Sequence, residues 1–213
     1  MFDYDSPRAH AARASVFLNK KWVRFGLMAV SAGSFLGWLV LVWVYQLKFG
    51  HALLIPAAWF AMPLFWFEGE LSKLLPTPTK GGQVKVHDVL ESSVLGRLNK
   101  EPSPSDLAKI VGKDTGGRFF ASRFGISQDF ITKLASGSPS DTEKIWQYAL
   151  QVQQRTGEPM LRSAHIFAAL IYSLEDYNFY LSQLHLDGDD IEAGLQWQAH
   201  IRTVIERYQE KKY

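Results

Sequence analysis

The feature that most constrains this chain is a run of 23 residues, 25–47, without a charged side chain. Crossing the hydrocarbon core of a bilayer takes roughly 20 apolar residues in a helix, so this run predicts a transmembrane span. After a short connector at 48–51, a second apolar run of 16 residues covers 52–67. It is short for a span, and we expect tilt or local thinning of the bilayer to cover the difference. Together the two runs predict a transmembrane hairpin over 25–67.

The charges beside the two runs predict the orientation of the hairpin. Five basic residues precede the first run: Arg8, Arg13, Lys20, Lys21 and Arg24. The connector carries only Lys48. Because basic flanks stay on the cytoplasmic side, a basic cytoplasmic tail (1–24) and a cytoplasmic domain are predicted for a multi-pass protein of the cell (inner) membrane. A signal peptide is disfavoured, since the first run is too long for one and lacks a small-residue cleavage site. A re-entrant second helix and a buried hairpin of a soluble protein are the alternatives.

Beyond the hairpin the composition is that of an ordinary soluble domain. Residues 68–213 hold 17 Lys/Arg and 19 Asp/Glu, so no basic face predicts a nucleic-acid partner. The chain has no cysteine, which excludes disulfides, thiolate zinc sites and cysteine nucleophiles. A linker is predicted over 68–83, because prolines and glycines gather in 75–82. The remainder is long enough for one domain with its own core.

Apolar residues recur at helical spacing after the linker, and no alternating strand pattern of useful length occurs. We therefore predict an all-α domain over 84–200. Its expected helices are 84–98, one capped by Ser105, one or two within 119–134, then helices from 140 or 141, from 163, from 177 and from about 191. Residues 112–117 are predicted to form a loop. A polar terminal helix over 201–213 is expected to lead into a further C-terminal part.

The two halves of this domain follow the same plan. Nineteen residues after Ser105 comes Phe124-Gly-Ile126, and 21 residues after Ser163 comes Leu184-His-Leu186. Each is followed by a polar stretch and another apolar helix. This agreement predicts two copies of a four-helix unit, a pseudo-repeat.

The second half carries a recognisable motif: Gly157-x-Pro159, then Ser163-Ala-His-Ile-Phe-Ala-Ala-Leu170, then Leu181-x-x-Leu-His-Leu-Asp187. It resembles one repeat of the N-terminal domain of Clp ATPases, and the resemblance covers about 84–200. It implies that the motif residues form the core of the two units: Phe124, Ile126, Ser163, His165, Ile166, Leu170, Leu184 and Leu186. It also implies a receptor for unfolded polypeptides or adaptor proteins that serves AAA+ motor modules. The hairpin departs from soluble members and suggests a membrane-anchored variant.

Motifs for catalysis or for metal ions are not recognisable. Residues 112–117 have the glycine spacing of a phosphate loop, but Arg118 and Phe119 stand where Lys and Ser or Thr are needed. The acidic stretch 187–192 lacks the glycine and glutamate positions of a calcium loop. The histidines show no metal spacing, and His165 is predicted to pack or to cap a helix. We expect no enzyme activity, no metal and no cofactor.

Aromatic residues of the second half predict where a polypeptide binds. An apolar groove between the units is expected to be lined by Trp146, Tyr172, Tyr177, Phe179 and Tyr180. The leading interpretation is a membrane-anchored module that binds substrates or adaptors of a Clp-type unfoldase, with the lipid bilayer as a second partner. The alternative is a structural protein that forms homo-oligomers or scaffolds a complex. In that case contact would come from one face of the terminal helix, with Ile201, Val204, Ile205 and Tyr208.

Overall fold

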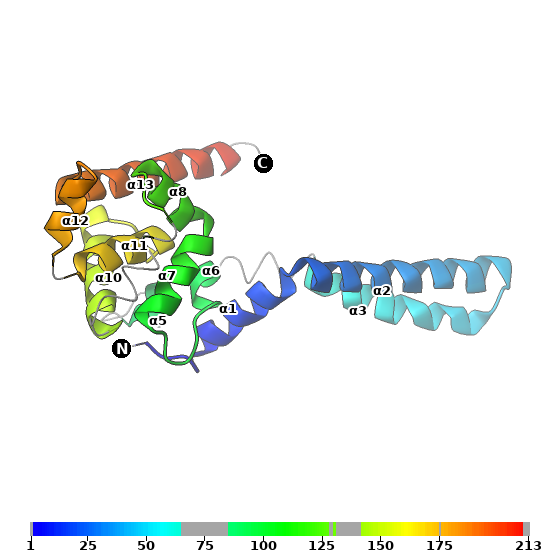
Figure 1. Ribbon diagram of the computed structural model, residues 1–213. Helices are drawn as coiled ribbons and strands as arrows, with labels where there is room; N and C mark the ends of the chain where they lie inside the picture. The colour runs from blue at the N-terminus through cyan, green and yellow to red at the C-terminus, as the bar shows by residue number, and fades with distance from the viewer. Residues whose placement is uncertain (1, 65–84, 128–129, 131–141, 175, 211–213) are drawn as a thin grey trace.

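An arm of antiparallel helices projects from a head of packed helices (Figure 1). The computed structural model describes residues 2–64, 85–127, 130, 142–174 and 176–210. Over these residues the chain forms helices and no strand, with one isolated bridge between Leu90 and Leu161. The all-α prediction is therefore confirmed for the described part. The predicted linker, 68–83, lies outside it, as does the end of the second apolar run.

The arm consists of two legs that run in opposite directions. The first is α2 (Lys21–Leu39), which continues as a π-helical turn, η1 (Val40–Val44). A 3₁₀ segment, η2 (Lys48–Leu53), reverses the chain, and α3 (Leu54–Met62) then runs back along α2 (Figure 1). Pro56 lies in the first turn of α3, where the missing N–H has no helical partner to lose. The helix therefore keeps its direction there.

The N-terminal segment is not a simple tail. Residues Pro7–Leu18 form α1, with Pro7 at its first position and the Ser6 hydroxyl accepting a hydrogen bond from the N–H of Ala9. Ala9 and Ala12 are fully buried in the core of the head. The guanidinium of Arg8 donates to the carbonyl of Leu90 at 3.1 Å. The predicted tail over 1–24 is thus corrected: most of it belongs to the head.

The first half of the head departs from the prediction in two places. The single helix expected over 84–98 is two short helices, α5 (Val86–Val89) and α6 (Ser92–Leu95). The chain is extended between them, because the N–H of Glu91 donates to Leu161 and the N–H of Leu161 donates to Val89. The loop expected at 112–117 is also wrong. Only Asp114 separates α7 (Pro104–Lys113) from α8 (Thr115–Arg123), and Ser103 rather than Ser105 caps α7.

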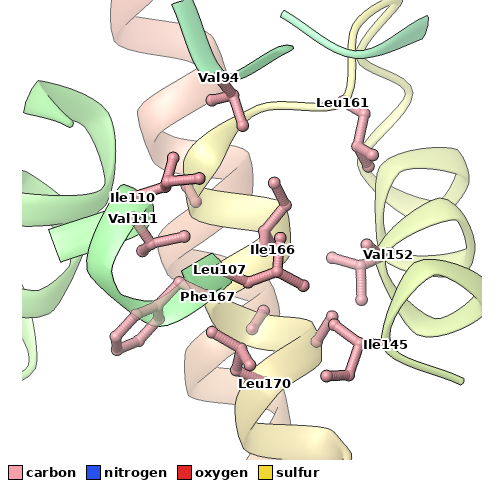
Figure 2. Packing of buried hydrophobic residues seen from close by; sticks show 14 of the residues in the cluster. Val94, Leu107, Ile110, Val111, Ile145, Val152, Leu161, Ile166, Phe167 and Leu170 are labelled. Carbon is pink, nitrogen blue, oxygen red and sulfur yellow. The ribbon is translucent and has the colours of Figure 1, made fainter. Parts of the chain in front are cut away.

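The second half follows the predicted order closely. It contains α10 (Thr142–Thr156), α11 (Ser163–Tyr172), α12 (Tyr177–Gln183) and α13 (Gly188–Glu210). The expected cap of α10 at 140 or 141 lies outside the described residues. All residues of α11 except Tyr172 are buried. Figure 2 shows this central helix between α7, with Leu107 and Val111, and α10, with Ile145 and Val152.

One turn occurs twice in the head with the same hydrogen bonds. After α8, Gly125 has φ +66°, and the N–H groups of Gly125 and Ile126 bond to Ser122 and Ala121. After α12, His185 has φ +55°, and the N–H groups of His185 and Leu186 bond to Ser182 and Leu181. Both are Schellman ends of a helix. The two segments that the sequence aligned therefore share a local conformation, although a non-glycine residue takes the left-handed position in the second.

Candidate functional site

The arm presents apolar side chains on most of its surface. Residues Lys21–Val44 form one helical leg of 24 residues. Its most apolar 18-residue window has a mean hydropathy of 2.0, and none of that window is buried. Among its exposed side chains are Phe25, Met28, Leu36 and Trp43. An apolar surface of this extent is typical of a membrane or protein contact. Among the described residues, one helix is long and apolar enough to cross a bilayer, and it is this leg.

Polar side chains of the arm pair across its two legs. The Ser31 hydroxyl donates to the carbonyl of Ala57 at 2.9 Å, and the indole N–H of Trp38 donates to Nδ1 of His51 at 3.2 Å. Unpaired polar groups are costly in hydrocarbon, and hydroxyl-to-carbonyl bonds are a common link between membrane helices. These contacts fit an arm surrounded by lipid.

The base of the arm carries aromatic and basic side chains. Trp22 is 67% exposed and contacts the ring of Phe17 edge-on, with centroids 5.8 Å apart. The ammonium of Lys20 lies 5.4 Å from the same Phe17 ring. Lys21 and Arg24 follow in the first turn of α2. Amphipathic aromatic residues beside cations are typical of the boundary between lipid and water.

A second feature is an open cleft of about 330 Å³ on the far side of the head. It lies where α10, α12 and the start of α13 meet, and is lined by Tyr148, Gln151, Val152, Arg155, Tyr172, Tyr177, Gly188, Asp189 and Glu192. We call it the tyrosine cleft. At its rim the guanidinium of Arg155 and the carboxylate of Glu192 are 2.6 Å apart. The cleft thus combines aromatic walls with a charged edge.

Tyr172 is fixed as a neutral hydrogen-bond donor in this cleft. Its hydroxyl donates to the carbonyl of Gly188 at 3.2 Å, and its ring meets that of Tyr177 edge-on at 5.6 Å. Burial raises the pKa of Tyr172 to about 12, and the nearby charge of Glu192 acts in the same direction. The phenol therefore does not ionise in the physiological range, and the cleft has no general base at this position.

The structure brings together only part of the predicted groove. Tyr172 and Tyr177 line the tyrosine cleft, whereas Phe179 and Tyr180 form a separate aromatic contact with each other on α12. Trp146 is corrected: it is 2% exposed and stacks on Phe2 from the N-terminal segment. The sequence interpretation missed Tyr148 and Arg155. Their separation of seven residues, two helical turns, places them on one face of α10 and was the available signal.

The residues of the Clp-like motif lie in or against the core. Five are buried: Ile126, Ser163, His165, Ile166 and Leu170. Phe124, Leu184 and Leu186 are partly buried and pack against them. None of these side chains lines the tyrosine cleft. In the structure they are packing residues.

His165 is held neutral by its surroundings. Its Nδ1 accepts the N–H of Arg162 at 3.0 Å, and its Nε2 lies 3.1 Å from the hydroxyl of Thr156. Burial lowers the pKa of His165 to about 3, and the charges of Arg162 and Arg202 add to this effect. Because Nδ1 accepts, the ring proton is on Nε2. The side chain caps the start of α11, one of the two roles predicted for it.

Charged side chains next to His165 join distant elements. Glu158 lies 3.1 Å from Nε of Arg162 and 3.7 Å from Arg202 on α13. Arg162 also lies 3.2 Å from Glu91, between α5 and α6. Burial raises the pKa of the Glu91 carboxyl, and Arg162 partly offsets the rise. No group of three metal-ligating side chains occurs in the described part of the chain. The cluster therefore acts as a link within the head.

Comparisons of this chain with protein-family models, curated proteins and solved structures gave no match. The likeness to the Clp N-terminal domain therefore stays a prediction from the motif residues.

Proposed function

We propose that this chain is a membrane-anchored polypeptide-binding module. In this proposal α2 and α3 both cross the bilayer, and the head stands on the cytoplasmic side. The tyrosine cleft takes up unfolded segments or adaptor proteins there, and delivers them to AAA+ motor modules of the Clp type. Three observations support the parts of this proposal: the packing of α1, the lengths of the two legs and the shape of the cleft.

The packing of α1 supports the proposed membrane topology. This helix precedes the arm, yet it packs against α5 and α6, which follow the arm. Both ends of the arm therefore lie on the same side of any membrane that α2 enters. A helix that crosses must then be matched by a returning segment, and α3 runs back along α2. The basic residues before α2 favour the cytoplasm for this shared side.

The lengths of the legs suit a bilayer. The 24 residues of the first leg extend ~36 Å as a helix, against ~30 Å for the hydrocarbon core. The six residues of η2 and the nine of α3 together extend ~26 Å. A modest thinning or tilt accommodates this difference.

The tyrosine cleft suits a short stretch of extended polypeptide. Its volume is that of a small ligand site and accepts one or two side chains rather than a folded surface. Tyrosine rings supply apolar contact, while Arg155 and Glu192 at the rim offer partners for peptide groups. Such a site binds each segment weakly, and tethering beside the bilayer raises the effective concentration of membrane-derived clients.

A binding measurement with the full chain in neutral detergent micelles tests this proposal. The probe is a fluorescently labelled, carboxymethylated protein that stays unfolded, followed by anisotropy. Tyr177→Ala removes one wall of the cleft and is expected to weaken binding roughly tenfold. Tyr208→Ala removes an aromatic side chain of equal size outside the cleft and is expected to leave binding unchanged. Equal affinity for both variants would exclude the tyrosine cleft as the binding site.

A second function is favoured by one observation on α13. Val204, Ile205 and Tyr208 are exposed near the end of this helix, and Tyr208 is 74% exposed. An apolar face of this kind suits association of helices, as expected for an assembly protein. Cross-linking in membranes separates the two proposals. Two results together would favour assembly: Tyr208→Ala abolishes cross-linked oligomers, and Tyr177→Ala binds polypeptide as the wild type does.

A further inference from the structure

A cleft of about 420 Å³ lies where the head meets the base of the arm. It opens between the end of α1 and α6. Its polar lining consists of Ser15, Asn19, Lys20, Ser92, Ser93 and Arg97. We call it the junction cleft. Ser15 and Asn19 also line a small cavity with Arg24, Leu27, Pro63 and Leu64, so the junction cleft adjoins the base of both legs.

The charge of the junction cleft has one sign. Two cations, Lys20 and Arg97, face it, and no carboxylate is among the described residues that line it. Arg97 has one acidic neighbour, Asp114, at 3.8 Å. That carboxylate accepts from the Ser163 hydroxyl and the N–H of Gly116 through Oδ2, and its Oδ1 lies toward Arg97. Hydroxyl and amide groups supply further donors around the two cations.

The position of the cleft selects the kind of anion. Lys20 directly precedes α2, and its neighbours Phe17 and Trp22 form the exposed aromatic pair at the base of the arm. If α2 enters the bilayer at this point, the cleft opens at the level of the lipid headgroups. Cations and hydroxyl donors match the oxygen atoms of a phosphodiester.

We propose that the junction cleft binds the phosphate of an anionic membrane lipid, with Lys20 and Arg97 as its cationic ligands. This inference rests on the membrane anchoring proposed above. The bound lipid would bridge α1 and α6 and would fix the head against the membrane surface. Glu91 is the N-cap residue of α6 and pairs with Arg162. The lipid contact at α6 would therefore also determine how the head is oriented over the bilayer.

The test uses the full chain in neutral detergent micelles and short-chain phosphatidylglycerol, with binding measured by calorimetry. Lys20→Gln is expected to weaken binding about fivefold, as for loss of one lysine contact to a lipid headgroup. Lys21→Gln makes the same charge change one residue outside the cleft, and is expected to bind as the wild type does. Ser93→Leu fills the cleft without changing its charge and is expected to weaken binding as well.

Four outcomes would contradict the proposal, and they have different meanings. Equal weakening by Lys20→Gln and Lys21→Gln would show diffuse attraction to a basic region. Unchanged binding by Ser93→Leu would place the lipid elsewhere. Equal affinity for inorganic phosphate would point to a soluble anion, and short-chain phosphatidylcholine bound as tightly would remove the role of charge. A flotation assay separates these results from the membrane proposal. A chain that does not float with vesicles overturns both membrane anchoring and the lipid site. A chain that floats without lipid preference overturns only the lipid site.

Discussion

The Ser163 hydroxyl donates a 2.6 Å hydrogen bond to the carboxylate of Asp114, and both groups are buried. The two residues start the neighbouring helices α11 and α8. Asp114 caps α8 through the N–H of Gly116 at 3.1 Å. One short contact thus fixes the relative position of the central helix and a helix of the first half.

Removing this hydroxyl tests how much the contact contributes. Ser163→Ala leaves the buried Asp114 carboxylate without one of its donors, and hydrogen bonds to charged groups contribute about 2 kcal/mol. We expect the free energy of unfolding of the head to fall by that amount, measured by denaturant titration in detergent. Ser173→Ala is the matched control, because the Ser173 hydroxyl, at the C-cap of α11, donates to the carbonyl of Leu170 in that same helix. A similar loss in both variants would contradict a special role for the Asp114 contact.

His165 makes the head sensitive to acid. Its pKa of about 3 in the folded state is below its ordinary value of 6.5, so the unfolded chain takes up the proton first. The contribution of His165 is therefore complete above pH 6.5 and is lost as the pH falls towards 3, by up to about 1.4 kcal/mol per pH unit. His165→Gln keeps an acceptor at the capping position and removes the titration. Its melting temperature should change less than that of the wild type between pH 7 and pH 4.5.

The control for this experiment is His185→Asn. His185 is exposed and has φ +55°, a conformation that asparagine tolerates, so the wild-type slope should remain. The raised pKa of Glu91 acts in the opposite sense: stability is greatest below its unfolded pKa and is lost as the pH rises through its folded pKa. The difference between wild type and His165→Gln isolates the histidine. Identical slopes for these two proteins would contradict the prediction.

Gly96 allows α6 to touch α1. A Cβ atom at this position would lie 2.6 Å from Val16 Cγ2 and would also meet the carbonyl oxygen of Ala12. Gly96→Ala is therefore expected to push α1 away and to destabilise the head by about 1–3 kcal/mol, measured by thermal unfolding. Gly33→Ala places the same methyl group in open space on the arm and should leave the head unchanged. Unchanged stability of Gly96→Ala would mean that α1 is not held against α6.

The absence of cysteine makes the topology directly measurable. Lys48→Cys places a thiol at the turn of the arm, and Lys113→Cys places one on the surface of the head. In intact spheroplasts, a maleimide that does not cross membranes should label Cys at 48 but reach 113 only after permeabilisation. Asp5→Cys should behave like Lys113→Cys, because α1 packs on the head. Labelling of 48 and 113 from the same side would show that the arm does not cross.

The sequence was most informative where periodicity is strong. The helices from Ser163 and Tyr177 begin where predicted, because their apolar residues at helical spacing are local signals. Ser103 rather than Ser105 caps α7. Both serines are followed by acceptable helix starts, but the Asp106 carboxylate accepts the N–H of Ser103 and so favours Ser103 as the cap. Glycines at 116 and 117 suggested a loop, yet a helix forms there because Asp114 caps it and Gly117 permits close contact with Val111.

Sequence patterns did not predict the contacts between residues far apart in the chain. The break at Glu91 exists because Leu161, 70 residues later, pairs with the backbone there. Helix α1 buries only small side chains, Ala9, Ala12 and Ser15, so its weak amphipathic pattern resembled a polar tail. Trp146 was predicted to be accessible because its cover, Phe2, comes from a segment with no helical pattern of its own. The tyrosine cleft likewise depends on where α10 meets α13, which no single segment specifies.

The burial of Ala9 and Ala12 sets an order of events during synthesis. Their partners in α6 leave the ribosome only after the whole arm has been made, so the head cannot close while the arm is still emerging. In the structure Asn19 and Leu64 line the same small cavity at the base of the arm, so a chain whose legs are already inserted would hold the two ends of the arm together and shorten the effective loop between α1 and α6. If the arm crosses the membrane, its insertion is thus expected to precede the folding of the head and to assist it.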